Sequence, residues 1–203
     1  MDPSRKIANA RALAQQLGRE GDVLTSRHFG SDFLVALKAL LSSTPLSSIL
    51  VLSFDGVEFM DGSFPDEVFA TLSAARSRRE IEASPMVLVD VNESCLDSLQ
   101  YALQSRPERE KNLGLRNCAL PLQENEGDRT SLTLVGKWED HVEQTFEILR
   151  TEVTLNARQL ADTMKLSIPA ASTRLKVLYD LGLALRSEMR DAQGKQFVYH
   201  WIG

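Results

Sequence analysis

Cysteine and histidine are scarce in this 203-residue chain, which contains two cysteines and three histidines. Cys95 and Cys118 have no second pair beside them, and His28, His141 and His200 are scattered. A disulfide framework or a zinc site needs closely spaced sets of such residues, so the sequence predicts neither, and it predicts no cofactor. So few thiols fit a reducing compartment, and we expect a cytoplasmic protein.

Long apolar runs are also missing. The first residues contain no apolar stretch between a basic flank and a small-residue cleavage site, and no segment approaches about eighteen consecutive apolar residues. The sequence therefore predicts neither secretion nor membrane association. With 43% hydrophobic and 25% charged residues, and with no biased tract or internal repeat, the composition is that of a globular protein with a core.

Common enzyme motifs are absent as well. The chain has no phosphate-binding glycine loop, no nucleophile elbow and no histidine with an evident partner. Several acidic residues are expected near the carboxyl ends of strands, where open α/β sheets place their sites. They are Asp55, Asp61, Asp66, Glu67 and Asp90. A solvated acidic loop explains them without catalysis, so we predict that the chain is not an enzyme.

Charge is distributed unevenly along the chain. The net charge is -5, but the part from Thr154 onward has seven Lys or Arg against four Asp or Glu, which leaves 16 against 24 before it. A basic end on an acidic chain points to nucleic acid at that end alone. The alternative is ordinary variation in surface charge.

Apolar spacing predicts alternating helices and strands over residues 1–150. We expect helices at residues 5–17 and 25–41, after Ser63, at 92–107 and at 139–152, with strands at 48–54, 85–91, 117–122 and 131–138. In the helix after residue 62, Ser63 is placed as the N-cap, with Asp66 and Glu67 at its positive end. This order predicts an α/β domain with a parallel or mixed sheet and packed helices.

The pattern changes after Val153, where a helix, a turn, a second helix and a strand pair follow one another. Asn156 is placed to cap the first of these helices, and Gly194 falls in the turn between the strands. An apolar stripe on the second helix is expected to face the core: Ile168, Ala171, Leu175 and Leu178. We place the boundary at Thr151 to Leu155, giving domains at 1–150 and 151–203.

This C-terminal pattern resembles the winged helix-turn-helix family of bacterial regulators. The matching positions are Leu160-Ala161, Ser167, Ser172 to Lys176, Leu178 and Leu181-Gly182-Leu183, followed by a hairpin. A helix of this kind fits the major groove, so Thr173 and Arg174 are expected to read bases, while Ser167, Ser172 and Lys176 hold phosphates. By the resemblance, Arg190, Gln193 and Lys195 on the wing would lie along the minor groove or backbone. The alternative is a protein-protein module with these residues solvated.

The segment from Ser47 to Leu72 resembles the STAS fold, named for sulfate transporters and anti-sigma factor antagonists. The family loop has the form F-M-D-S-S-G, and this chain has Phe59-Met60-Asp61-Gly62-Ser63-Phe64, which places Ser63 at the family's phosphorylation switch. Phe64 replaces the glycine, and the carboxylates of Asp66 and Glu67 are expected to repel a phosphoryl group. Ser63 acting only as a helix cap is the alternative.

The sequence thus predicts a homodimeric transcriptional regulator in which the winged helix binds double-stranded DNA and a STAS-like domain senses a signal or a partner protein. The second hypothesis is an adaptor without DNA binding, which contacts a kinase-like or anti-sigma-type partner through the STAS-like domain.

Overall fold

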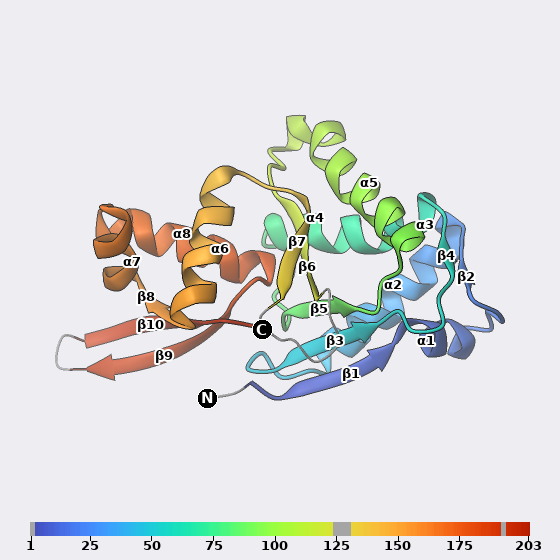
Figure 1. Ribbon diagram of the computed structural model, residues 1–203, viewed down its shortest axis with the longest axis horizontal. Coiled ribbons are helices and arrows are strands. Elements are labelled where there is room, and N and C mark those ends of the chain that lie inside the picture. The colour runs from blue at the N-terminus through green and yellow to red at the C-terminus, as the bar shows by residue number, and fades with distance from the viewer. Residues whose placement is uncertain (1–2, 124–130, 192–193) are drawn as a thin grey trace.

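A five-stranded mixed sheet forms the centre of the protein (Figure 1). The computed structural model describes residues 3–123, 131–191 and 194–203. In spatial order the strands are β1 (Arg5–Asn9), β3 (Ile49–Ser53), β5 (Met86–Val89), β6 (Cys118–Gln123) and β7 (Leu132–Lys137). The first four run parallel and β7 runs antiparallel to β6, which confirms the predicted α/β class with a mixed sheet.

One face of the sheet is covered by helices from the first half of the chain. They are α1 (Ala10–Gln16), α2 (Arg27–Ser42), α3 (Ser63–Pro65), η1 (Asp66–Ala70), α4 (Thr71–Ser77) and α5 (Glu93–Arg109). The segments α3, η1 and α4 follow one another without a break, and η1 is a π-helical turn. Leu50 and Leu52 of β3 point toward these helices and join the first apolar cluster. Smaller elements complete this part: β2 (Val23–Leu24), β4 (Phe59–Met60) and η2 (Lys111–Leu113).

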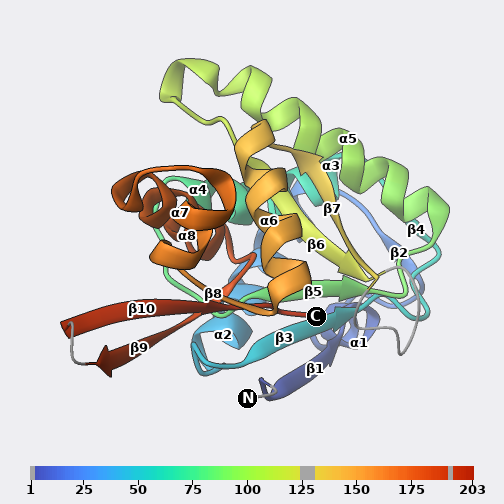
Figure 2. The ribbon, with the colours of Figure 1, turned by 60° about the vertical axis from the view of Figure 1, so that its left-hand side comes forward.

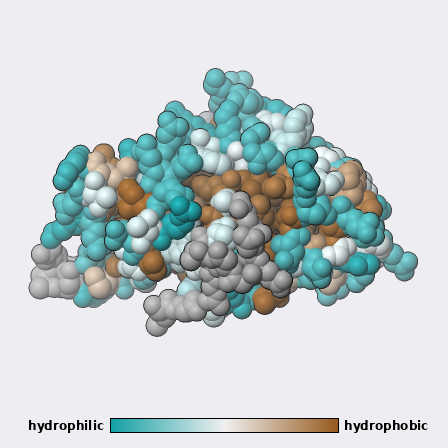
Figure 3. All heavy atoms as spheres, viewed as in Figure 1, coloured by the Kyte–Doolittle hydropathy of each residue, from teal (hydrophilic) through white to brown (hydrophobic). Residues whose placement is uncertain are grey.

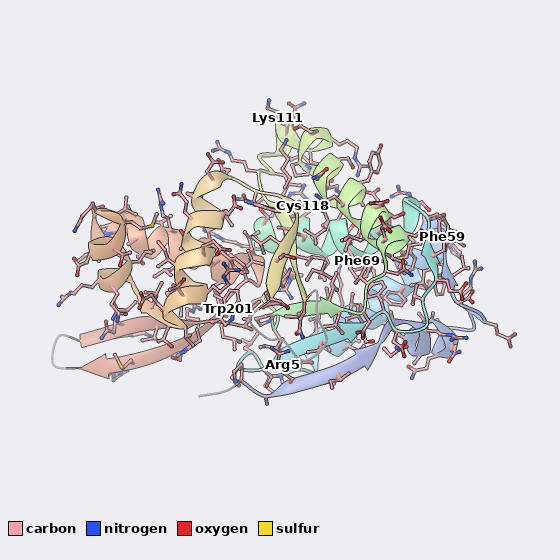
Figure 4. The ribbon with its side chains drawn as sticks, viewed as in Figure 1. Arg5, Phe59, Phe69, Lys111, Cys118 and Trp201 are labelled. Carbon is pink, nitrogen blue, oxygen red and sulfur yellow. The ribbon has the colours of Figure 1, made fainter. Side chains whose placement is uncertain are left out.

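The opposite face of the sheet packs against the C-terminal elements through the second apolar cluster. They are α6 (Asp140–Glu152), β8 (Thr154–Asn156), α7 (Ala157–Met164), α8 (Ile168–Leu181), β9 (Leu185–Asp191) and β10 (Gly194–His200). Ile49 and Val51 alternate with the leucines of β3 and belong to this second cluster, together with Phe146 and Trp201. The rings of Phe146 and Trp201 lie 4.8 Å apart between centroids, and Figure 4 shows Trp201 where the C-terminal elements meet the sheet.

The C-terminal strands form a separate antiparallel sheet in the order β8-β10-β9. The predicted strand pair around residue 194 is therefore confirmed. Helix α6 packs on α8 within the second cluster. A division at residues 151–155 thus separates α6 from the elements on which it packs, and the two predicted domains share one apolar cluster.

The helix expected at residues 5–17 is wrong in its first part. Arg5–Asn9 form the edge strand β1, paired in parallel with β3, and the helix begins at Ala10. Ile7, which lies inside the expected helix, is 75% exposed. Asn9 accepts a hydrogen bond from the Ala12 N–H at 2.8 Å and caps the shortened helix. Pairing with β3, which local periodicity does not report, decides the conformation here.

The other element boundaries lie close to the expected ones. Asn92 caps α5 by accepting from the Cys95 N–H at 2.9 Å, and the helix continues past Pro107 to Arg109, two residues beyond its expected end. Within the described ranges, no helix is both long enough and apolar enough to cross a lipid bilayer.

Candidate nucleic-acid interface and the Ser63 site

The buried stripe of α8 fixes which of its side chains reach solvent. Ala171, Leu175 and Leu178 are fully buried, as the spacing predicts, whereas Ile168 is 50% exposed. Ile168 is the first residue of the helix and lies beyond the edge of the cluster, so its place in the stripe was wrong. Gly182 ends the helix in the left-handed conformation, with φ at 76°.

The first half of α8 presents hydroxyl groups to solvent. Ser167, Ser172 and Thr173 are exposed, and the first turn contains no acidic residue. Ser167 caps the helix by accepting from the Ala170 N–H at 3.4 Å, and the Thr173 hydroxyl donates to the Pro169 carbonyl at 3.0 Å. An uncovered helix N-terminus without carboxylates favours an approaching anion. This end of the molecule, at the left in Figure 3, is largely hydrophilic, whereas apolar atoms gather along the middle of the same face.

Arg174 and Lys176 do not share the environment of these hydroxyls. Arg174 is half-buried and turns toward α7, where its Nη1 lies 3.6 Å from the sulfur of Met164. Among the described residues it has no carboxylate partner. Lys176 instead donates to both carboxylate oxygens of Asp180 at 2.7 Å, and Asp180 also accepts from Arg79 at 2.7 Å. Lys176 is therefore held by Asp180, and this one carboxylate is shared by two cations.

The hairpin of β9 and β10 carries the remaining predicted contacts. Arg190 and Lys195 lie opposite each other, 80% and 52% exposed, and both pair with Glu188, at 3.5 and 2.6 Å. The hydrogen bond from Lys195 is the main cause that lowers the pKa of Glu188. Figures 1 and 2 show the hairpin extending from the same end of the molecule as α7 and α8. Gln193 lies outside the described residues.

Asp61, and not Ser63, caps the helix that follows residue 62. Its Oδ1 accepts from the N–H groups of Ser63 and Phe64 at 3.1 and 2.9 Å and from the Ser63 hydroxyl at 2.9 Å, and its Oδ2 accepts from the Ser26 N–H at 3.1 Å. Burial acts to raise the pKa of Asp61, but these hydrogen bonds prevail and lower it. The predicted cap was therefore wrong, because Ser63 is already the first residue of α3.

Three arginines surround the Asp66 carboxylate, whose side chain is only 6% exposed. Arg27 lies 2.8 Å from it, Arg106 lies 3.5 Å from it, and Arg109 forms a close ion pair with it. Burial acts to raise the pKa of Asp66, but the hydrogen bonds from Arg109 and Arg27 outweigh it, so the pKa is lowered. Arg27 also binds Glu67 at 2.9 Å. The carboxylates expected to repel a phosphoryl group near Ser63 are thus neutralised.

Ser63 lies in a cavity of about 300 Å³ beside these groups. Arg27 and Arg109 line it together with Tyr101, whose side chain is largely exposed. Sequence reasoning missed all three arginines of the Asp66 cluster. Arg106 and Arg109 stand one turn apart on a predicted helix, which was the available signal, but nothing in the sequence connects them to Asp66.

The acidic residues considered for catalysis do not converge. Asp61 holds the Ser26 and Ser63 segments, Asp66 is enclosed by arginines, and Asp90 accepts from the Ser53 hydroxyl at 2.6 Å. In the part of the chain that the structure describes, no group of three His, Cys, Asp or Glu could hold a metal ion.

Two exposed cations, one at each end of α7, also escaped sequence reasoning. Lys165 occupies the turn between α7 and α8 with φ at 55°, and Arg158 lies in the first turn of α7. The excess of Lys and Arg over Asp and Glu in the C-terminal part was the signal that includes them.

Comparison with known protein families, with curated proteins and with solved structures finds no match for this chain.

Proposed function

We propose that this chain is a DNA-binding transcriptional regulator, in which the C-terminal elements act as a winged helix and the STAS-like α/β part receives a signal or a partner protein. The supporting arrangement is α6, β8, α7, α8, β9 and β10 in that order, with a sheet ordered β8-β10-β9. The observation that carries the proposal is the exposed first half of α8, free of acidic residues in its first turn and opposite its buried stripe.

Helix α8 has the dimensions and chemistry to read a DNA groove. Its 14 residues span about 21 Å, and a helix of this diameter fits the major groove. The Ser172 hydroxyl can donate and accept hydrogen bonds, and the Thr173 hydroxyl, which donates to the Pro169 carbonyl, can still accept, so both suit base edges or phosphates. Among the described residues, the one polar partner of Arg174 is a thioether, which is a weak acceptor, so its rotation toward DNA costs little.

A homodimer is part of this proposal. One α8 with one hairpin supplies few contacts, and winged helices of this size gain affinity and specificity by placing two copies on a two-fold site. Sedimentation with and without a palindromic duplex measures the stoichiometry. A strict one-to-one complex on every duplex would remove the dimer from the proposal.

The test measures the affinity of the full-length protein for random duplex DNA by fluorescence anisotropy. Affinity should fall steeply between about 50 and about 200 mM salt, because phosphate contacts release counterions. On random duplex DNA, Arg174→Ala should weaken binding and reduce the salt slope by about one unit, because it removes a cation. Thr173→Ala should cost about 1–3 kcal/mol only on a selected sequence, where a base contact is lost. Lys38→Ala, an exposed lysine on α2, is the matched control and should bind as the unchanged protein does. Absence of binding at low salt contradicts the proposal.

A second candidate function is an adaptor that acts through protein contacts alone. It is favoured by the charge balance of the C-terminal part, where Asp180 neutralises Lys176 and Glu188 is shared by two hairpin cations. In this case the Ser63 cavity, flanked by Arg27 and Arg109, would accept the regulatory phosphate or partner. Mass spectrometry of protein purified from its own host tests for phosphate on Ser63. Its absence under all growth conditions leaves Ser63 as a first-turn residue bound to Asp61.

A further inference from the structure

Arg76, in the last turn of α4, is a buried cation without a counter-charge. Its side chain is among the largest that are fully buried, and the residue is 2% exposed. Nη2 donates to the Ser84 carbonyl at 2.6 Å and Nη1 to the Ala83 carbonyl at 3.5 Å, while Nε has no acceptor among the described residues. No carboxylate in the same ranges pairs with it. Burial lowers the pKa of Arg76 to about 10, so the group stays charged at neutral pH.

A buried charge is normally paired or bound to an ion, because its desolvation is costly. The Ser84 and Ala83 carbonyls accept hydrogen bonds from the Arg76 guanidinium, but their partial negative charges do not neutralise its full positive charge. The uncompensated charge therefore calls for an anion at this place, and the neighbouring cavity supplies the room for one.

Arg76 lines a cavity of about 250 Å³ between α4 and the C-terminal elements. Four cationic and two acidic side chains line this junction cavity: Arg76, Arg79, Lys176, Arg186, Glu82 and Asp180. The carboxylates are already engaged, since Asp180 binds Arg79 and Lys176 and Glu82 accepts from the Tyr179 hydroxyl at 2.6 Å. The cavity thus carries a net charge of about two positive units, from its own charged side chains.

We propose that the junction cavity binds a small phosphate-type oxyanion, either free phosphate or the phosphoryl group of a small molecule. Arg76 supplies the buried positive charge, and the N–H groups of its guanidinium beyond the two that bind the Ala83 and Ser84 carbonyls are donors for a phosphoryl oxygen. Arg79 and Lys176 already bind one anionic group, the Asp180 carboxylate, and their remaining N–H donors can bind the oxyanion as a second one. The volume lies just below the ~300–1,000 Å³ of sites for drug-sized ligands, which favours a compact anion.

The position of the junction cavity connects an anion to α8. A Cβ at Gly182, the C-cap of α8, would meet the guanidinium of Arg76, so this guanidinium lies directly against the end of the helix. An oxyanion bound by Arg76 and Lys176 contacts α4 and α8 at once and stabilises their present arrangement. Its effect on DNA binding rests on the proposed function, whereas the binding of the anion does not.

The experiment titrates inorganic phosphate into the full-length protein, with chloride at equal ionic strength as the reference, and measures heat of binding and thermal unfolding. Phosphate should raise Tm beyond chloride, because a ligand that binds only the folded state stabilises it. Arg76→Met should lose binding, and Arg79→Gln and Lys176→Gln should each weaken it about tenfold or more, since hydrogen bonds between charged groups are lost. Lys38→Gln is the matched control and should bind normally.

Arg79→Gln and Lys176→Gln change partly exposed side chains, so they can refute the proposal even where Arg76→Met fails to fold. A Tm that responds equally to phosphate and chloride overturns the proposal, and so does unchanged phosphate affinity in both Arg79→Gln and Lys176→Gln. A parallel titration with glycerol phosphate identifies the source: tighter binding than inorganic phosphate assigns a phosphorylated small molecule, and equal binding assigns the free ion. Phosphate binding without any DNA binding supports this site and rejects the proposed function. DNA binding without phosphate binding supports the proposed function and rejects this site.

Discussion

Gly182→Ala should destabilise the protein far more than Gly114→Ala, although the two glycines have almost the same backbone conformation. Their φ angles are 76° and 74°, and both are left-handed caps at the end of a helical segment. They differ in their surroundings. A Cβ at Gly182 would collide with Nη1 of Arg76 and lie 2.8 Å from its Cζ, whereas a Cβ at Gly114 meets nothing within 4 Å.

The expected magnitudes follow from this difference. Both substitutions place an alanine in the left-handed region, which costs about 1 kcal/mol. Gly182→Ala must also displace the Arg76 guanidinium from the Ser84 and Ala83 carbonyls, and a buried polar group left without its partner costs about 1–3 kcal/mol. We therefore expect a loss of about 1 kcal/mol at Gly114 and about 3 kcal/mol at Gly182.

Urea unfolding followed by tryptophan fluorescence and by circular dichroism measures both losses. A double-mutant cycle with Arg76→Met isolates the contact, because the flexible, uncharged methionine yields to the new methyl group. Gly182→Ala should cost at least about 0.5 kcal/mol less in that background. Equal losses at Gly182 and Gly114, or the same loss at Gly182 in both backgrounds, would show that Arg76 does not restrict this position.

Three further predictions concern other parts of the molecule. Ser26→Gly should stabilise the protein by about 1 kcal/mol in urea unfolding. Ser26 has φ at 76° and ψ at 140°, which strains the backbone by about 1–3 kcal/mol, and glycine replaces a serine cap at little cost. The control is Asn9→Gly, at a cap with ordinary extended backbone, which should give no gain. Asp66→Asn should be less stable than the unchanged protein at neutral pH, and this difference in the free energy of unfolding should close as the pH falls below about 4. The pKa of Asp66 is lower in the folded than in the unfolded protein, so its carboxylate stabilises the fold above the unfolded-state pKa, and this stability is lost when the group is protonated. A constant gap from neutral to acidic pH contradicts this. Glu188→Gln should tighten DNA binding and steepen its salt dependence by about one unit of slope, because Lys195 and Arg190 are released. Unchanged binding in anisotropy would place the hairpin away from DNA.

Features governed by neighbouring residues could be predicted from the sequence. The continuous apolar runs of β3 and β5 mark strands buried on both faces, and β3 does send alternate side chains into two clusters. Asn156 was predicted as a cap, and its partner Gln159 lies three residues away. The hydrogen bonds that decide these elements are local, so the local sequence reports them.

Features that depend on distant contacts could not be predicted in this way. Arg109 and Asp66 are 43 residues apart, and Arg79 and Asp180 are 101 residues apart, so no spacing rule connects either pair. The same holds for β1, which becomes a strand by pairing with β3. At Ser63 the residue type fits a cap, but Asp61, two residues earlier, takes that role once Ser26 approaches it.

The apolar cluster shared by the sheet and the C-terminal elements makes the whole chain a single folding unit. Removing the residues after 150 would uncover Ile49, Val51 and Val87 on the sheet, and an isolated C-terminal fragment would lose Phe146, against which Trp201 packs. Each half on its own would thus expose a patch prone to aggregation. Heat and denaturant should melt both halves in one cooperative step.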